Sequence, residues 1–371
     1  MSEKFEKGKK ANSAKQKINK IDFYLFIYNI YVSISIKSLI IILFSTAFIY
    51  IQLKGKTYNK IDLEISIDNK YIYTSIVFLT SLLSNRAKST FYTIHILTDN
   101  QFSIESFNII KTILERFGKN GAKVIYYNLE DDFKGASIGG FALPVYYRIA
   151  TPSVLSNVDK LIHSDTDIVN FKDLSELYSI KFKKDMYICA VLEELKVKKD
   201  VEDLGIKVDK YVNAGILLMD LKAMRENSVE KKLRDFISTH NLVFCDQTAI
   251  NAVCHDNIQI IPYKYNTFAV NSYEELLDIN NGQNPMYKFN ESEIYQAYHD
   301  PALVHFLGHR KPWLKEYHSV YKIYWWYYAK ISGYFNEILN YYKCDVNEIE
   351  NLLKTIPEDG GLLKGKYKKF I

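Results

Sequence analysis

Apolar runs alternate with amphipathic segments from about residue 61 onward. Amphipathic segments with the apolar spacing of helices are 71–84, 103–117, 142–156 and 222–239. Runs rich in β-branched and aromatic residues, typical of strands, are 61–67, 91–97, 122–128, 158–164, 187–192, 215–221 and 302–306. This alternation predicts an α/β fold with a mixed, mostly parallel sheet flanked by helices. Ligands of such sheets bind beyond the carboxyl ends of the strands.

The two ends of the chain differ from this middle part. Residues 1–20 are polar and lysine-rich, which predicts a disordered tail. Segment 21–56 is hydrophobic, but its uncharged run 38–53 is shorter than the roughly 20 residues that cross a bilayer as a helix. It is interpreted as a membrane anchor or an interfacial segment, with an apolar extension packed on the protein as the alternative. Segment 314–371 is aromatic and basic, which predicts a helical region that either faces a membrane or packs on the body.

Charge is concentrated at the amino terminus. The chain carries 48 Lys+Arg against 43 Asp+Glu, a net charge of +5, and residues 1–20 alone contribute seven lysines and two glutamates. The rest is therefore balanced, which argues against a nucleic-acid partner. The basic ends suit an anionic membrane surface. The four cysteines include no CxxC pair, which argues against structural zinc and favours a reducing compartment.

An Asp-x-Asp triplet follows the predicted strand 158–164. Asp165 and Asp167 stand at its carboxyl end and precede the apolar pair Ile168 and Val169. Two carboxylates on alternate residues can chelate one divalent cation, whose charge offsets their repulsion. A solvated surface turn is the alternative interpretation. The position at a strand's carboxyl end favours a metal site.

A short loop after the last predicted strand combines further candidates. His305 ends the apolar run, Gly308 permits a tight turn, and Lys311 precedes a proline. Imidazole suits Mn²⁺ better than Mg²⁺, and a lysine suits phosphate. His309 in the same loop is a competing metal-ligand candidate.

Two weaker signals complete the set. Asn213 precedes Ala214 and Gly215, small residues that allow a ligand to approach the backbone. Asp246 either caps the helix that follows it or faces a ligand. Gln247 then lies in the first turn of that helix and points into the cleft.

Taken in order, these segments resemble the retaining glycosyltransferases of family 8, the glycogenin-like and lipopolysaccharide-galactosyltransferase-like enzymes with the GT-A fold. The resemblance covers 61–313, the expected catalytic domain, and includes ISIDNKY (65–71) and the stretch 145–178 around the Asp-x-Asp triplet. One departure lies directly before that triplet. The family usually has an apolar residue and a leucine there, whereas this chain has Ile162, His163 and Ser164.

The resemblance implies a role for each candidate residue. Asp165, Asp167 and His305 would hold Mn²⁺, with Mg²⁺ as the alternative, and the metal would bridge the diphosphate of a UDP-sugar. Asp246 would hold the donor sugar's hydroxyls, and Gln247 would lie on the β-face of its anomeric carbon; these two are the implied catalytic residues. The implied donor-binding residues are Asp68, Tyr71, Arg148, Asn213, Ala214, Gly215, Gly308 and Lys311.

The implied activity is metal-dependent, retaining transfer of galactose or glucose from a UDP-sugar to a hydroxyl of a glycan acceptor. The acceptor would be lipopolysaccharide or another cell-surface glycan, lipid-linked or not. Because Gln247 is an amide and not a carboxylate, attack on the face from which UDP leaves is favoured over a covalent intermediate. The alternatives are a metal-dependent phosphohydrolase or nucleotidyltransferase, and a non-catalytic membrane-tethered protein that binds nucleotide-sugars.

The location of the catalytic domain has two interpretations. A basic tail, one span and a large domain predict a type II single-pass membrane protein with the domain outside the cytoplasm. In a bacterium, that layout would separate the domain from cytoplasmic UDP-sugars. The four unpaired cysteines favour the cytoplasmic face of a membrane instead.

Overall fold

The computed structural model describes residues 58–129, 132–133, 142–193, 210–242, 244–281, 288–357 and 361–363. The chain divides into two units, 1–57 and 58–371, and every described residue belongs to the second. The predicted tail 1–20 and hydrophobic segment 21–56 therefore lie outside the described residues. Within the described ranges, no helix has the length and apolar character needed to span a membrane.

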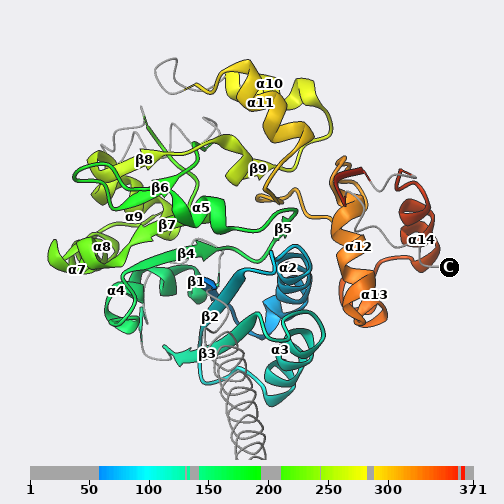
Figure 1. Cartoon of the computed structure of the whole chain (residues 1–371), viewed down its shortest axis with the longest axis horizontal. Helices are drawn as coiled ribbons and strands as arrows, with labels where there is room; N and C mark the ends of the chain where they lie inside the picture. The colour runs from blue at the N-terminus through cyan, green and yellow to red at the C-terminus, as the bar shows by residue number, and fades with distance from the viewer. Residues whose placement is uncertain are drawn as a thin grey trace, which may run out of the picture. The chain divides into compact units, whose positions relative to one another are not determined.

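A seven-stranded sheet forms the centre of the molecule, in the order β3-β2-β1-β4-β7-β6-β8 (Figure 1). Its neighbours pair in parallel except along β7, which is antiparallel to both β4 and β6, so the predicted mostly parallel sheet is confirmed. The strands are β1 (Asn59–Ser66), β2 (Thr90–Thr98), β3 (Ala122–Asn128), β4 (Lys160–Ser164), β6 (Ile188–Ala190), β7 (Ile216–Asp220) and β8 (Ile258–Ile260).

A second sheet of three short strands brings distant parts of the chain together. It has the order β5-β10-β9, with β5 (Ile168–Asn170), β9 (Thr267–Phe268) and β10 (Leu303–His305). The antiparallel pairing of β10 with β5 places His305 opposite Ile168. His305 therefore lies beside the Asp-x-Asp triplet, which directly precedes β5.

Helices surround both sheets. They are α2 (Ile72–Ser84), α3 (Ile104–Phe117), α4 (Thr151–Val154), α5 (Ser175–Ser179), α7 (Leu221–Glu226), α8 (Val229–Thr239), α9 (Cys245–Cys254), α10 (Tyr273–Asn281), α11 (Glu291–His299), α12 (Lys322–Ser332), α13 (Phe335–Tyr342) and α14 (Val346–Lys354).

Two predicted helices are broken. Segment 142–156 is mostly the 3-10 helix η2 (Leu143–Ala150), and only the single turn α4 is α-helical. Pro152 has no N–H with which to continue an α-helix. Segment 222–239 is divided into α7 and α8 at Ser228, whose φ of 51° lies in the left-handed region.

The C-terminal helices α12, α13 and α14 form one group, drawn in orange to red in Figure 1, with α12 packed against α2. Trp325 and Trp326 are fully buried, and the indole Nε1 of Trp326 donates a hydrogen bond to the backbone oxygen of Pro312 at 3.0 Å. Of the two interpretations of this segment, packing on the body therefore holds for these two tryptophans. They do not form a membrane-facing surface. The terminal lysines after residue 363 lie outside the described residues.

Candidate active site

A pocket of about 660 Å³ opens where β4 and β10 end and β7 begins. The end of β4 and the beginning of β7 lie side by side because the two strands pair antiparallel. Just beyond them, the backbone N–H of Asp165 donates to the oxygen of Gly215 at 2.8 Å. The sequence-predicted residues that line the pocket are Tyr71, Arg148, Asp165, Asp167, Asn213, Ala214, Gly215, Asp246, Gln247, His305, Gly308 and Lys311.

Three potential metal ligands converge in this pocket. The ligand atoms of Asp165, Asp167 and His305 all lie within 4.8 Å of one another. His305 Nε2 is 3.2 Å from Asp167 Oδ1 and 3.8 Å from Asp165 Oδ2. Between the two aspartates, Thr166 turns away and its hydroxyl lies 2.9 Å from that of Thr74 on α2. Alternation along this extended segment thus turns both carboxylates to the same side.

Hydrogen bonds fix the orientation of His305. Its Nδ1 lies 3.1 Å from Oδ1 of the buried Asn266, whose Nδ2 donates to Asn213 Oδ1 at 2.7 Å. Because Nδ1 faces an amide oxygen, Nε2 is the ring nitrogen directed at the two aspartates and available to a metal ion. A Cβ on Gly215 would lie 2.2 Å from His305 Cε1, so only glycine leaves room for the imidazole.

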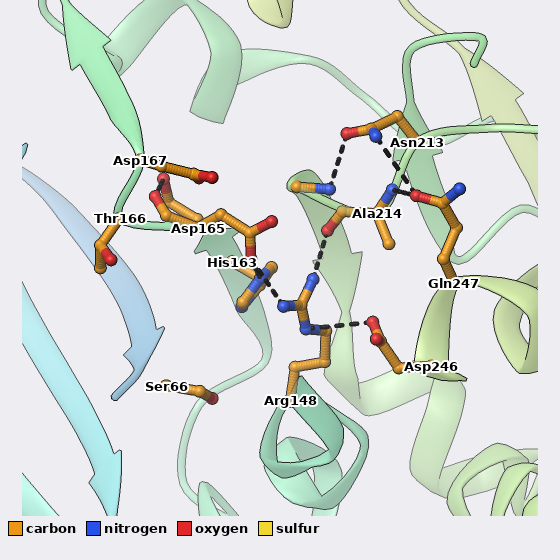
Figure 2. A network of polar contacts seen from close by, with 12 residues as sticks. Ser66, Arg148, His163, Asp165, Thr166, Asp167, Asn213, Ala214, Asp246 and Gln247 are labelled. Atoms are coloured by element: carbon orange, nitrogen blue, oxygen red, sulfur yellow. Dashed lines mark hydrogen bonds and ion pairs between the residues drawn. The ribbon is translucent and has the colours of Figure 1, made fainter. Parts of the chain in front are cut away.

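The buried guanidinium of Arg148, carried by η2, joins both acidic sides of the pocket (Figure 2). It donates to Asp165 Oδ1 and to the backbone oxygen of Ala214, each at 2.6 Å, and its Nε lies 3.2 Å from Asp246 Oδ2. Burial alone would lower the pKa of Arg148, but Asp165 and Asp246 raise it above its usual value. Arg148 therefore stays charged in the pocket.

Neighbouring positive charges offset the effect of burial on the pKa of Asp165 and Asp167. Burial raises the pKa of Asp165, but Arg148, His163 and His305 together hold it well below its usual range. For Asp167, burial acts in the same direction, and Lys311 and His305 lower the pKa to about 2. Both aspartates are thus carboxylates at neutral pH, the state that binds a metal ion.

Asp246 faces the pocket from the first turn of α9. The N-cap residue of α9 is Phe244, with no side-chain cap hydrogen bond, so the alternative prediction that Asp246 caps this helix is wrong. The side chain is buried and lies beside Arg148. Burial raises the pKa of Asp246 to about 6, and Arg148 opposes that shift only in part.

Amide side chains form the wall next to Asp246. Gln247 Oε1 accepts hydrogen bonds from the backbone N–H of Ala214 at 3.0 Å and from Asn213 Nδ2 at 3.2 Å. Glu193 Oε2 accepts from Asn213 Nδ2 at 2.6 Å and from Gln247 Nε2 at 3.3 Å. Glu193 was not predicted as a site residue. As the first polar residue after the apolar run 187–192, it carries the same signal as Asp165.

The loop after β10 supplies the opposite wall. Lys311 Nζ forms an ion pair with Asp167 and donates to the backbone oxygen of Phe306 at 2.7 Å. Gly308 has a φ of 48°, in the left-handed region that glycine favours, in agreement with the predicted tight turn. His309 lines the pocket but is not part of the three-residue cluster.

Asp68 is the predicted site residue that is not among the lining residues of the pocket. It caps the 3-10 helix η1 (Asn69–Tyr71), with Oδ1 accepting from the backbone N–H of Lys70 at 2.8 Å and of Tyr71 at 3.3 Å. Burial raises the pKa of Asp68, and these two hydrogen bonds oppose the rise. Asp68 therefore positions Tyr71, which does line the pocket.

Comparisons with known proteins give the family of this chain. The chain is 26% identical over 175 residues to general stress protein A of Bacillus subtilis, covering 45% of this chain and 58% of that relative. It is 23% identical over 269 residues to the lipopolysaccharide 1,3-galactosyltransferase of Salmonella typhimurium, covering 69% and 73%. The crystal structure of the galactosyltransferase LgtC in complex with donor and acceptor sugar analogs has a TM-score of 0.59 at 19% identity, covering 79% of this chain and all of that one. The glycosyl transferase family 8 model matches residues 62–317, and the chain therefore belongs to this family, with a GT-A fold.

Proposed function

We propose that this protein is a metal-dependent, retaining hexosyltransferase that moves galactose or glucose from a UDP-sugar to a hydroxyl of a glycan. The acceptor would be lipopolysaccharide or another cell-surface glycan, at the cytoplasmic face of a membrane. The observation that carries the proposal is the convergence of Asp165, Asp167 and His305 in a pocket that also holds a lysine and several amides. The relative from Salmonella typhimurium supports the class of acceptor.

The residues present fit a divalent cation. Two carboxylates and one imidazole with its Nε2 directed at them form a donor set that suits Mn²⁺, with Mg²⁺ as the alternative. Asp165, Asp167 and His305 would hold the ion. When bound, it would stabilise the charge that develops on the diphosphate leaving group. Lys311, next to Asp167, would add a second positive charge toward the same phosphates.

The other side of the pocket would orient the sugar. Asn213, Glu193 and Gln247 present hydrogen-bonding groups that suit sugar hydroxyls, and Asp246 lies beside them. Gln247 is a weak nucleophile, and its Oε1 already accepts two hydrogen bonds. The acceptor hydroxyl would therefore attack on the face from which UDP departs, and the departing phosphate would take its proton.

UDP release from a panel of UDP-sugars in the presence of Mn²⁺ tests the proposal. The full-length protein is compared with Asp165→Ala and Asp167→Ala, and with Asp235→Ala, an exposed carboxylate on α8, as matched control. Release from one donor that EDTA and both pocket substitutions abolish, with sugar linked to an added glycan, supports the transferase. UMP and sugar 1-phosphate as the products, with and without a glycan, would favour the phosphohydrolase, and UDP binding without any release would favour a binding protein.

A further inference from the structure

A buried ion pair lies directly beneath the proposed metal site. Glu64 on β1 and His163 on β4 are adjacent in the parallel register, and both side chains are almost fully inaccessible to solvent. His163 Nδ1 lies 2.5 Å from Glu64 Oε2. Burying two ionisable groups carries a desolvation cost, and an apolar pair of similar volume usually packs with equal or greater stability. Stability of the sheet therefore does not account for this pair.

Hydrogen bonds extend from the pair to the pocket on both strands. Ser66, a lining residue at the end of β1, donates its hydroxyl to Glu64 Oε1 at 2.5 Å. On β4, His163 Nε2 lies 3.4 Å from Asp165 Oδ1. Figure 2 shows His163 next to Asp165 and Arg148, on the side away from Asn213. The network thus joins the ends of two parallel strands below the metal-ligand cluster.

The two oxygens of Asp165 have different surroundings. Oδ1 receives Arg148 Nη2 at 2.6 Å and faces His163 Nε2, whereas Oδ2 faces His305 Nε2. One oxygen is therefore anchored and the other is presented to the cluster.

We propose that Glu64 and His163 are a positioning pair for Asp165. Both ring nitrogens of His163 face carboxylate oxygens, Nδ1 that of Glu64 and Nε2 the Oδ1 of Asp165. Glu64 fixes the imidazole, and the imidazole fixes the carboxylate with Oδ2 directed at the cation. This inference rests on the proposed metal-dependent function.

Mn²⁺ binding to the full-length protein, followed by electron paramagnetic resonance of the unbound ion, tests the pair without any turnover. The variant Glu64→Leu/His163→Phe removes both charges together and keeps the volume. We expect its Mn²⁺ Kd to rise about tenfold, as for other losses of a ligand's hydrogen-bond partner, with an unchanged or higher Tm. The matched control is Asp62→Leu/His95→Phe, which removes a second His–carboxylate pair, 2.9 Å apart, on β1 and β2 outside the pocket. Its Kd should stay at the wild-type value.

Equal Mn²⁺ affinity of the wild type and Glu64→Leu/His163→Phe would overturn the positioning role and leave the proposed function intact. No Mn²⁺ binding by the wild type would overturn both. Nitrogen-15 NMR of the wild-type histidine rings gives a readout that does not depend on folding of the variant. A proton on Nε2 of His163, the nitrogen that faces Asp165, supports the pair, and an unprotonated Nε2 contradicts it.

Discussion

The two sides of the pocket are built from different chemistry. On one side, Asp165 and Asp167 are each paired with a cation, Arg148 or Lys311, and share His305. On the other side, uncharged amides dominate, and the carboxylate of Glu193 accepts hydrogen bonds from two of them. Asp246 lies between the sides and has a raised pKa.

This difference indicates a division of labour. The first side keeps its carboxylates ionised by placing positive charge around them, which suits a site for a cation and a diphosphate. The second side offers directional hydrogen bonds with little net charge, which suits the recognition of hydroxyl groups. Changes on the first side should therefore abolish metal and UDP binding, and changes on the second should affect transfer while leaving UDP binding intact.

The largest expected effect comes from Asp167→Asn. The amide keeps the volume but removes the charge that Lys311 and the metal ion share. We expect UDP release to fall roughly 10³-fold, the upper range for loss of one stabilising group at a developing charge. Steady-state UDP release at saturating Mn²⁺ measures it, and activity within threefold of the wild type would remove Asp167 from the metal site.

Asp246→Asn tests the environment of Asp246, which lies between the two sides of the pocket. The readout is the pH dependence of the free energy of unfolding. Burial raises the pKa of Asp246 from 3.8 to about 6, so the folded protein binds this proton more tightly than the unfolded chain. The contribution of this bound proton to the stability of the folded protein is complete below about pH 4 and is lost as the pH rises through 6. At pH 7.5 the ionised carboxylate costs about 3 kcal/mol, which Asn avoids.

Urea unfolding at pH 7.5 and at pH 4 measures this difference. Asp246→Asn should be the more stable protein at pH 7.5, and the gain should disappear near pH 4. The exposed Asp235→Asn serves as control and should show no such dependence. A variant that is less stable than the wild type at pH 7.5 would show that the carboxylate is stabilised by Arg148 more than burial penalises it.

Asn266→Ala tests whether the orientation of His305 contributes to metal binding, because the variant keeps His305 and removes the amide that orients it. Without the amide oxygen at Nδ1, His305 loses the partner that directs its Nε2 at the aspartates. We expect Mn²⁺ to bind about tenfold more weakly. Calorimetric titration of Mn²⁺ measures this change in affinity. Asn280→Ala is the control, because Asn280 is also a buried amide and its described hydrogen bonds join it to the backbone of Phe289. Equal Mn²⁺ affinity in all three proteins would contradict the orienting role.

An effect of the same size is expected for Glu193→Gln, on the amide side. Loss of two charge-assisted hydrogen bonds should lower kcat/KM about tenfold, with Mn²⁺-dependent UDP binding unchanged. Initial rates over a range of donor concentrations give the ratio. A 10³-fold or larger loss in this variant, together with burst release of UDP by the wild type, would instead identify Glu193 as a nucleophile and replace front-face attack by a covalent route.

The strands that lie within long apolar runs could be predicted, whereas β5, β8 and β9 could not. Segments 61–67, 91–97 and 122–128 are long β-branched runs, and they match β1, β2 and β3 closely. β5, β8 and β9 have only two or three residues each, and they are strands only because a distant partner pairs with them. No local periodicity records such pairing.

The site shows a similar limit. A polar residue directly after an apolar strand, such as Asp165, could be identified because α/β sheets place ligands there. Glu64 could not, because Asp62, Glu64 and Ser66 alternate with apolar residues in the pattern of a strand with one face in water. In the structure, η2 packs against β1, and Glu64 is fully buried.

Calorimetric titration of UDP into the full-length protein, with Mn²⁺ and then with EDTA, tests the central claim most directly. If one side of the pocket is a cation-dependent diphosphate site, UDP should bind with Mn²⁺ and lose nearly all affinity with EDTA or in Asp167→Asn. Glu193→Gln should bind UDP as the wild type does. UDP binding of equal strength with EDTA, or its loss in Glu193→Gln alone, would contradict the division of the pocket into a charge side and a sugar side.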